Sequence, residues 1–171
     1  MARRTPVLLF ALMALIVSVA IAGPGDKRLG RCLPTSGEIS GWNVVGDSYR
    51  YGEGSGTHDI YNGDAIVNSG LDAACSQSYK NNGNRITVYC NEFNSRAKSK
   101  SWYDDHTTGS GWNSVSVSES GKYKVVSSTV VGHLYRGQVH ARIVVYGTGD
   151  SQISALKSFM QKVSSRVGQN Y

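Results

Sequence analysis

One dipeptide constrains the fold more than any other feature of this sequence. Asn82-Gly83 stands between two stretches in which apolar and polar residues alternate. Asn-Gly favours a two-residue type I′ turn, which joins antiparallel strands and fixes their register. Tyr79 then faces Ile86 and Gln77 faces Val88 on a mostly apolar face. The opposite face carries Ser76, Ser78, Lys80, Arg85 and Thr87. We expect such a hairpin to bury its apolar side against another element.

The element that can cover a sheet face lies at the end of the chain. Apolar residues there recur at intervals of three and four, which predicts an amphipathic helix capped by Asp150 or Ser151. The stripe consists of Ile153, Leu156, Met160, Val163 and Val167. A stripe of this kind packs on a sheet.

The remaining patterns predict strands and two shorter helices. We expect strands over 42–51, 112–118, 122–127, 128–135 and 138–147. A turn is expected at Glu119-Ser120-Gly121, and helices are expected over 58–69, after Thr57, and over 95–106, after Asn94-Ser95. Together these elements predict an α+β fold: a mainly antiparallel sheet packed by a C-terminal amphipathic helix and two shorter helices.

Residues 1–22 are predicted to be a secretory signal peptide. Arg3-Arg4 precede an apolar run of 15 residues, and Ala20-Ile21-Ala22 has the small-x-small pattern of a cleavage site. An uncleaved membrane anchor is the alternative, but spanning a bilayer takes roughly 20 residues. We therefore expect an exported protein, periplasmic or extracellular, with no membrane span after cleavage. Residues 23–40 are expected to form an extended leader, and residues 41–171 a single α+β domain.

The predicted export bears on the oxidation state of the cysteines. Exported proteins meet oxidising conditions, and the hairpin register places Cys75 opposite Cys90, so we expect a disulfide between them. Against this, the pair falls on a hydrogen-bonded site of the hairpin, where Cα atoms lie about 5.5 Å apart rather than about 4.5 Å. A bond from Cys32 to either partner is the alternative, and one thiol is left over in each case.

Three stretches together carry a resemblance to a known family. They are Leu33-Pro34 followed by 39–42, the run 60–65 that leads to Gly70, and the hairpin strand that continues into a helix near Ala97. With the closing helix, this pattern resembles DUF6599, a family of exported bacterial proteins of unknown function, over about residues 33–167. The resemblance implies export and an α+β fold, and it implies no activity.

The family-like run contains one set of candidate ligand-binding residues, Tyr61, Asn62 and Asp64. Polar side chains early in a helix stabilise its N-terminus, which is the structural interpretation. The functional interpretation is that these side chains line a cleft between helix and sheet.

Two histidines form the second candidate site. If Arg136-Gly137 is a two-residue turn, His133 faces His140 across two strands. Two such imidazoles could hold a metal with a third ligand, His106 or Asp105. The alternative is two solvated histidines on an exposed strand face, and a three-residue loop with a bulge at Gly137 would separate them.

These observations favour a function without catalysis. The chain lacks a convergent nucleophile, base and metal motif, which predicts a non-enzymatic binding or structural module of the cell envelope or extracellular space, without a cofactor. The alternative is a small secreted metal-dependent hydrolase that uses His133 and His140. The net charge of +6, which falls to +4 without the two arginines of the signal peptide, is too mild for a nucleic-acid binder. The charge is compatible with an anionic envelope polymer as partner, and the alternative is a plain solvated surface.

Overall fold

One antiparallel sheet runs through the protein. The computed structural model describes residues 23–60 and 70–171, and eight strands lie within these ranges. Their order is β1-β3-β4-β8-β7-β6-β5, and β2 pairs with β3 as well. The strands are β1 (Asn43–Val44), β2 (Arg50–Glu53), β3 (Leu71–Asn81), β4 (Asn84–Phe93), β5 (Asn113–Ser114), β6 (Ser120–Val126), β7 (Thr129–Arg136) and β8 (Val139–Tyr146).

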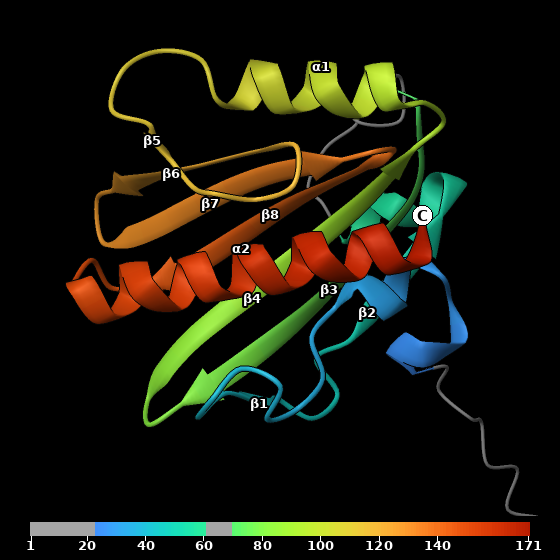
Figure 1. Ribbon diagram of the computed structural model, residues 1–171. Helices are drawn as coiled ribbons and strands as arrows, with labels where there is room; N and C mark the ends of the chain where they lie inside the picture. The colour runs from blue at the N-terminus through green and yellow to red at the C-terminus, as the bar shows by residue number, and fades with distance from the viewer. Residues whose placement is uncertain (1–22, 61–69) are drawn as a thin grey trace, which may run out of the picture.

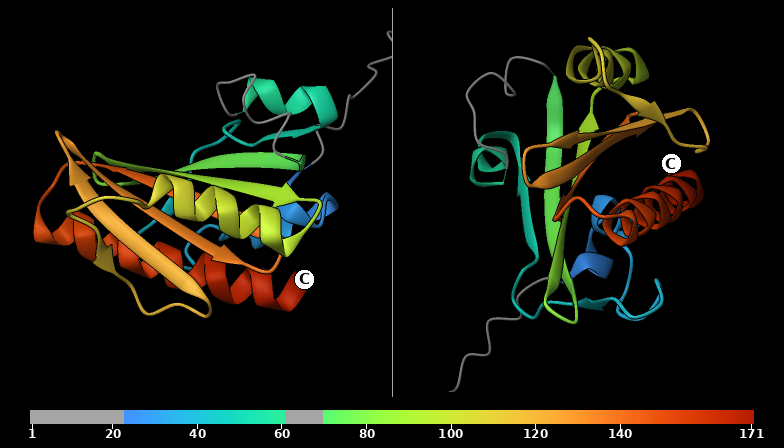
Figure 2. Two further views of the ribbon diagram at one scale, coloured as in Figure 1. Left: turned by 90° about the horizontal axis from the view of Figure 1, so that it is seen from above. Right: turned by 90° about the vertical axis from the view of Figure 1, so that its left-hand side faces the viewer.

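Two α-helices cover opposite faces of this sheet. Helix α2 (Asp150–Asn170) packs on β7 and β8, and it crosses in front of the sheet in Figure 1. Helix α1 (Arg96–His106) contacts β4, β7 and β8 from the other side. The right-hand view of Figure 2 shows β6 and β7 between the two helices. The predicted α+β fold, with the C-terminal helix on the sheet, is confirmed.

The central hairpin has the predicted register. Cys75 pairs with Cys90, Gln77 with Val88 and Tyr79 with Ile86. Asn82 and Gly83 have φ angles of 43° and 87°, the left-handed values that a type I′ turn requires. The helix predicted after Asn94-Ser95 is also confirmed, because the backbone N–H of Lys98 donates to Ser95 Oγ at 3.3 Å and caps α1.

The α2 face of the sheet is the main core. Its central side chain is Phe159, whose ring centroid lies 5.5 Å from that of Trp42 and 4.9 Å from that of Tyr79. Gly132 is needed for close approach, since a Cβ there would lie 2.7 Å from Met160 Sδ. The fully buried apolar residues of this layer include Val130, Leu134, Val139, Ala141, Ile143, Val145, Leu156, Phe159, Met160, Val163 and Val167.

Several predicted boundaries are wrong. The strand expected over 42–51 is divided into β1 and β2 by a turn in which Asp47 has a φ of 55°. The strand expected over 112–118 is only two residues long, and β6 begins within the turn predicted at 119–121. Residues 58 and 59 of the helix expected over 58–69 belong instead to a 3-10 helix, η3 (Gly54–Asp59), which also contains Thr57. Residues 61–69 lie outside the described residues, so the rest of that helix stays a prediction.

The segment 23–40 is not an extended leader. It contains two 3-10 helices, η1 (Pro24–Asp26) and η2 (Leu29–Cys32), and η2 contacts α2. Leu29, Cys32 and Leu33 are buried in the main core. Glu38 binds Lys162 and Arg166 of α2 in ion pairs at 3.4 and 2.6 Å. The segment is therefore part of the folded core, and its apolar residues provide the reason.

The predicted disulfide between Cys75 and Cys90 is not formed. The structure holds Cys32, Cys75 and Cys90 as free, buried thiols. The register that brings Cys75 opposite Cys90 also places them at the wider, hydrogen-bonded spacing, which accounts for the absence of the bond. Hydrogen bonding to Cys75, together with burial, raises the pKa of the Cys90 thiol, and burial raises that of Cys32. Protonated, buried thiols of this kind are structural rather than reactive.

Candidate functional site

The face of the sheet under α1 differs from the α2 face because it is polar. Strand register lines its side chains up in rows that cross β4, β8, β7 and β6. In one row Tyr89 pairs with Arg142, Arg142 with His133, and His133 with Lys122. The next row consists of Asn91, His140, Tyr135 and Ser120. The two predicted histidines therefore lie on this face, in adjacent rows.

The predicted pairing of His133 with His140 is wrong in register but correct in proximity. The turn is formed by Gly137-Gln138, with Gly137 at a φ of 56°, so His133 pairs with Arg142 and His140 with Tyr135. This displacement of two positions keeps both imidazoles on one face, since side chains alternate with a period of two. They become diagonal neighbours, with His133 Nδ1 3.0 Å from His140 Nε2.

The histidines are buried rather than solvated. The exposed fraction is 4% for His133 and 0% for His140, so the interpretation as an exposed strand face is wrong. Burial, followed by the charges of His106 and Arg142, lowers the pKa of His133 to about 3. Burial, with His133 as the next cause, also lowers the pKa of His140 well below its usual value. Both rings are therefore neutral at physiological pH.

A third histidine joins the pair without forming a metal site. His106, the last residue of α1, stacks on His133 with centroids 5.7 Å apart, and its Nδ1 lies 2.8 Å from the carbonyl oxygen of Trp102. Within residues 23–60 and 70–171, no group of three or more His, Cys, Asp or Glu side chains is arranged to hold a metal ion. The ligand set that the hydrolase hypothesis needed beside His133 and His140 is thus not found in this part of the chain.

A groove opens where α1 ends. Its volume is about 390 Å³, and it is lined by His106, Trp112, Val126, Val131, His133 and Arg142. Trp112 stands edge-on to His133, with centroids 5.7 Å apart, and its indole N–H donates to the carbonyl of Thr108 at 3.1 Å. At the tip of the β6–β7 hairpin, Val126 is 46% exposed, and Tyr146 of β8, at the same end of the sheet, is 54% exposed.

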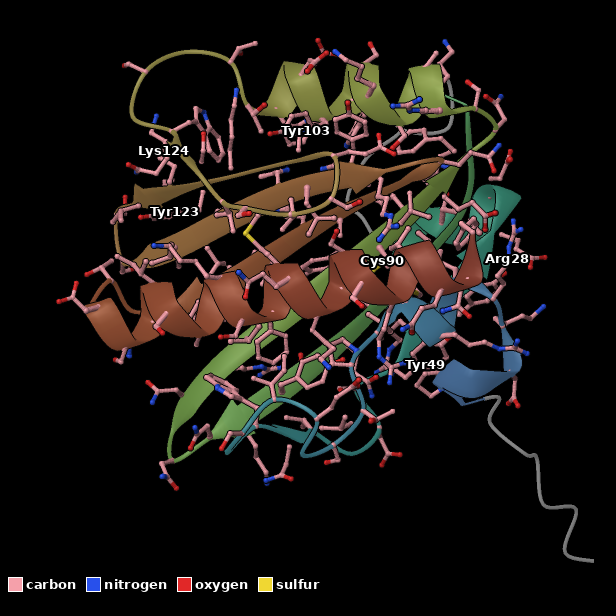
Figure 3. The ribbon with its side chains drawn as sticks, in the orientation of Figure 1. Arg28, Tyr49, Cys90, Tyr103, Tyr123 and Lys124 are labelled. Carbon is pink, nitrogen blue, oxygen red and sulfur yellow. The ribbon has the colours of Figure 1, made fainter. Side chains whose placement is uncertain are left out.

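Two lysines of β6 hold the loop that forms one wall of this groove. Lys122 donates to the carbonyl of Thr107 at 3.5 Å, and Lys124 donates to that of Ser110 at 3.0 Å. Figure 3 shows Lys124 at this loop and Tyr103 pointing from α1 toward the sheet. The hydroxyl of Ser120 donates to Tyr103 Oη at 2.8 Å and helps to dock α1. The groove is therefore positioned by regular elements on both sides.

A second cavity lies at the C-terminal end of α2, with a volume of about 480 Å³. Its charged lining groups already serve the fold. Arg136 donates to the carbonyl of Ser164 at 2.9 Å, in space that a Cβ at Gly168 would occupy. Glu119 accepts from the backbone N–H of Gly137 at 2.9 Å and from Arg96 at 3.2 Å. We therefore assign this cavity a structural role and treat the groove as the candidate site.

Sequence reasoning found part of the groove and missed the rest. His133 and His140 were predicted to lie side by side on one strand face, and His106 was named as a possible third ligand. Trp112, Val126 and Val131 were missed, because the loop that carries Trp112 has no periodic signal. Tyr61, Asn62 and Asp64 lie outside the described residues. The predicted cleft there stays untested.

Comparisons with known proteins identify the fold alone. No family model matches the sequence, and no curated protein matches it. The structure is similar to that of the extracellular domain of PknH from Mycobacterium tuberculosis, with a TM-score of 0.50 and 14% sequence identity. The alignment covers 83% of this chain and 95% of that domain. Among the described residues, no helix has the length and apolar character needed to cross a membrane.

Proposed function

We propose that this protein is an exported, non-enzymatic binding module, and that the groove beside α1 binds an anionic polymer of the cell envelope. One observation carries the proposal. The six residues that line the groove combine a guanidinium, two imidazoles and an indole with two valines, and none of them is acidic. Such a lining matches a ligand that has an anionic group next to an apolar surface.

The electrostatics of the sheet face support an anionic ligand. Arg142 lies next to His133 in one row, and Lys122 follows on its other side. The imidazole of His133 between them is neutral, so the positive charge of the row resides on the arginine and the lysine. A partly buried guanidinium interacts strongly with an anion, because the surrounding dielectric is lower than that of water.

Export is the second part of the proposal. The apolar run and cleavage pattern of residues 1–22 support it. The similar fold of a mycobacterial kinase's extracellular domain is consistent with an extracellular module. Membership of the DUF6599 family, which would imply the same location, remains a prediction.

The test is a binding titration of the purified full-length protein by isothermal calorimetry. The probe is a glycerol-phosphate oligomer, and a neutral dextran of equal length serves as its uncharged counterpart. Replacement of Arg142 by Gln should lower the affinity for the oligomer by about tenfold or more, because a hydrogen bond to a charged group is worth about 1.5–3 kcal/mol.

The matched control is Arg50→Gln. Arg50 is exposed on β2, where it donates to the carbonyls of Asp47 and Tyr49. Both variants lose one positive charge, so a specific site predicts a loss of affinity only for Arg142→Gln. Equal losses in the two variants would indicate non-specific attraction, and equal binding of dextran would contradict an anion site.

A further inference from the structure

The polar groups behind the groove form a hydrogen-bonded chain. The amide nitrogen Nδ2 of Asn91 lies 3.5 Å from His140 Nδ1, and His140 Nε2 lies 3.0 Å from His133 Nδ1. Asn91 and His140 are fully buried, so water does not compete for these bonds. A buried chain of this kind has to place each proton between one donor and one acceptor.

Asn91, the first member of this hydrogen-bonded chain, sets which group in each bond is the donor and which the acceptor. With Nδ2 rather than Oδ1 of Asn91 facing the ring, the amide donates and cannot accept, so His140 Nδ1 is the acceptor. The single proton of neutral His140 is then on Nε2, where it is donated to His133 Nδ1. His133 in turn carries its proton on Nε2. Asn91 thereby determines which nitrogen of His133 is protonated, although the two residues are not in contact.

The protonated nitrogen of His133 belongs to a ring that lines the groove. Within the described part of the chain, His133 Nε2 is not among the buried side-chain polar atoms that lack a hydrogen-bond partner. The hydrogen bond of His133 to a protein group uses Nδ1. Because Nδ1 is engaged by His140, Nε2–H is the group of this ring that is left for a ligand in the groove, beside Arg142 in the same row.

We propose that Asn91 and His140 are positioning residues that hold His133 as a neutral Nε2–H donor for an oxyanion bound in the groove. The inference rests on the proposed function and specifies its ligand chemistry. One guanidinium charge together with a neutral donor is the complement of a singly charged group such as a phosphodiester. The opposite tautomer of His133 would present a lone pair at Nε2 and repel the same group.

The direct test is nitrogen-15 NMR of the histidine side chains in the full-length protein at pH 7.5. Protonated and unprotonated ring nitrogens differ widely in chemical shift, so the tautomer of each ring is read without a ligand. We expect a protonated Nε2 and an unprotonated Nδ1 in both His133 and His140. A protonated Nδ1 in either ring would reverse the chain and overturn the inference.

A variant links the tautomer to binding. Asn91→Leu has a similar volume but no donor, so both tautomers of His133 should be populated. The affinity for the glycerol-phosphate oligomer should then fall by about threefold to tenfold, the value of one neutral hydrogen bond. The control is Ser99→Ala, a buried position on α1 whose hydroxyl has no partner in the described structure, and it should leave the tautomers and the affinity unchanged.

The two proposals fail in different ways. If the oligomer does not bind while the tautomers are as expected, the proposed function is wrong, and with it the role of His133 as a donor. If the oligomer binds at Arg142 but His133 carries its proton on Nδ1, only the positioning role of Asn91 and His140 is wrong. An unchanged affinity of a folded Asn91→Leu protein with mixed tautomers would likewise overturn that positioning role.

Discussion

A helix covers each face of the sheet, but the side chains buried beneath the two helices differ in polarity. Under α2 the interface is apolar, and its eleven central side chains are fully buried. Under α1 the buried layer contains polar groups: Asn91, Ser99, Thr107, His133 and His140. The α2 helix has 21 residues, whereas α1 has 11 and leaves part of its face uncovered.

This difference separates the main source of folding free energy from the face that carries the candidate site. Apolar burial contributes roughly 25 cal/mol per Å², which makes the α2 face the main source of folding free energy. Buried polar groups contribute little net stability, but they require defined partners and geometry. The α1 face therefore fixes the orientation of a few polar side chains, and the short helix leaves them next to an open groove.

The largest effect is expected from a cavity in the α2 face. Phe159→Ala should lower the free energy of unfolding by about 3–5 kcal/mol, because the ring is fully buried between Trp42 and Tyr79. Urea denaturation measures this change. The adjacent exposed position provides the control, since Ser158→Ala should change stability by less than about 0.5 kcal/mol. A loss below about 1 kcal/mol in Phe159→Ala would show that this face is not the main core.

The polar face should respond to pH. In the folded protein His133 has a pKa of about 3, and the pKa of His140 is also lowered, so both rings stay neutral in mild acid. In the unfolded chain the same histidines take up protons below about pH 6.5. The unfolded state then binds more protons, so stability is lost as pH falls below about 6.5. Between pH 6 and pH 5 we expect a slope of about 2–2.5 kcal/mol per pH unit.

Replacement of one ring checks the source of that slope. His140→Leu should remove about half of it, measured by urea denaturation at several pH values, because one of the two depressed groups is gone. Above pH 7.5 both proteins should show little pH dependence from these groups. An unchanged slope in the variant would mean that the histidine pair is not the origin of the acid sensitivity.

A smaller effect is expected where the N-terminal segment binds the outer side of α2. Burial works against the charge of Glu38, but hydrogen bonds from Arg166 and Thr35 outweigh it and hold its pKa at about 2. Glu38→Gln should lower the free energy of unfolding by about 1–2 kcal/mol at pH 7. This contribution is present above about pH 4.5 and lost as pH falls toward 2, so wild type and variant should converge in acid denaturation.

The hydrogen bond that docks α1 should contribute less again. Tyr103→Phe removes the acceptor of Ser120 Oγ and should lower stability by about 1 kcal/mol. Hydrogen exchange should report faster opening of α1 amides, while α2 amides change less. Equal acceleration in both helices would show that the two faces do not act as separate regions.

The smallest effect on stability is expected at the groove itself. Arg142→Gln should change the free energy of unfolding by about 0.5 kcal/mol or less, because surface-proximal charges contribute little to folding. Chemical denaturation measures it beside the binding titration. A loss above about 2 kcal/mol would assign Arg142 to the structure rather than to recognition.

Local signals in the sequence were sufficient for much of the fold. Asn82-Gly83 specified the central hairpin, because few other turns suit that dipeptide, and the stripe from Ile153 to Val167 specified α2. Alternation along β7 and β8 placed His133 and His140 on one face of the sheet despite the wrong turn. A displacement of two residues leaves every side chain on the same face of its strand, which is why His133 and His140 still lie close together.

Other features depend on tertiary contacts that no local pattern shows. The turn between β7 and β8 uses Gly137-Gln138, where Arg136-Gly137 fitted the sequence equally well. The segment 23–40 has polar composition, yet Leu29, Cys32 and Leu33 bury into the core. Trp112 reaches the groove from an irregular loop that Lys122 and Lys124 hold in place, and neither lysine carried any signal of that role.

The most direct test of the groove is an amide and side-chain NMR titration of the full-length protein with the glycerol-phosphate oligomer. The account predicts that the largest shifts cluster at the indole of Trp112, the imidazoles of His106 and His133, and the guanidinium of Arg142, while α2 signals stay in place. Shifts confined to α2 or to exposed lysines, with the groove signals unmoved, would contradict it.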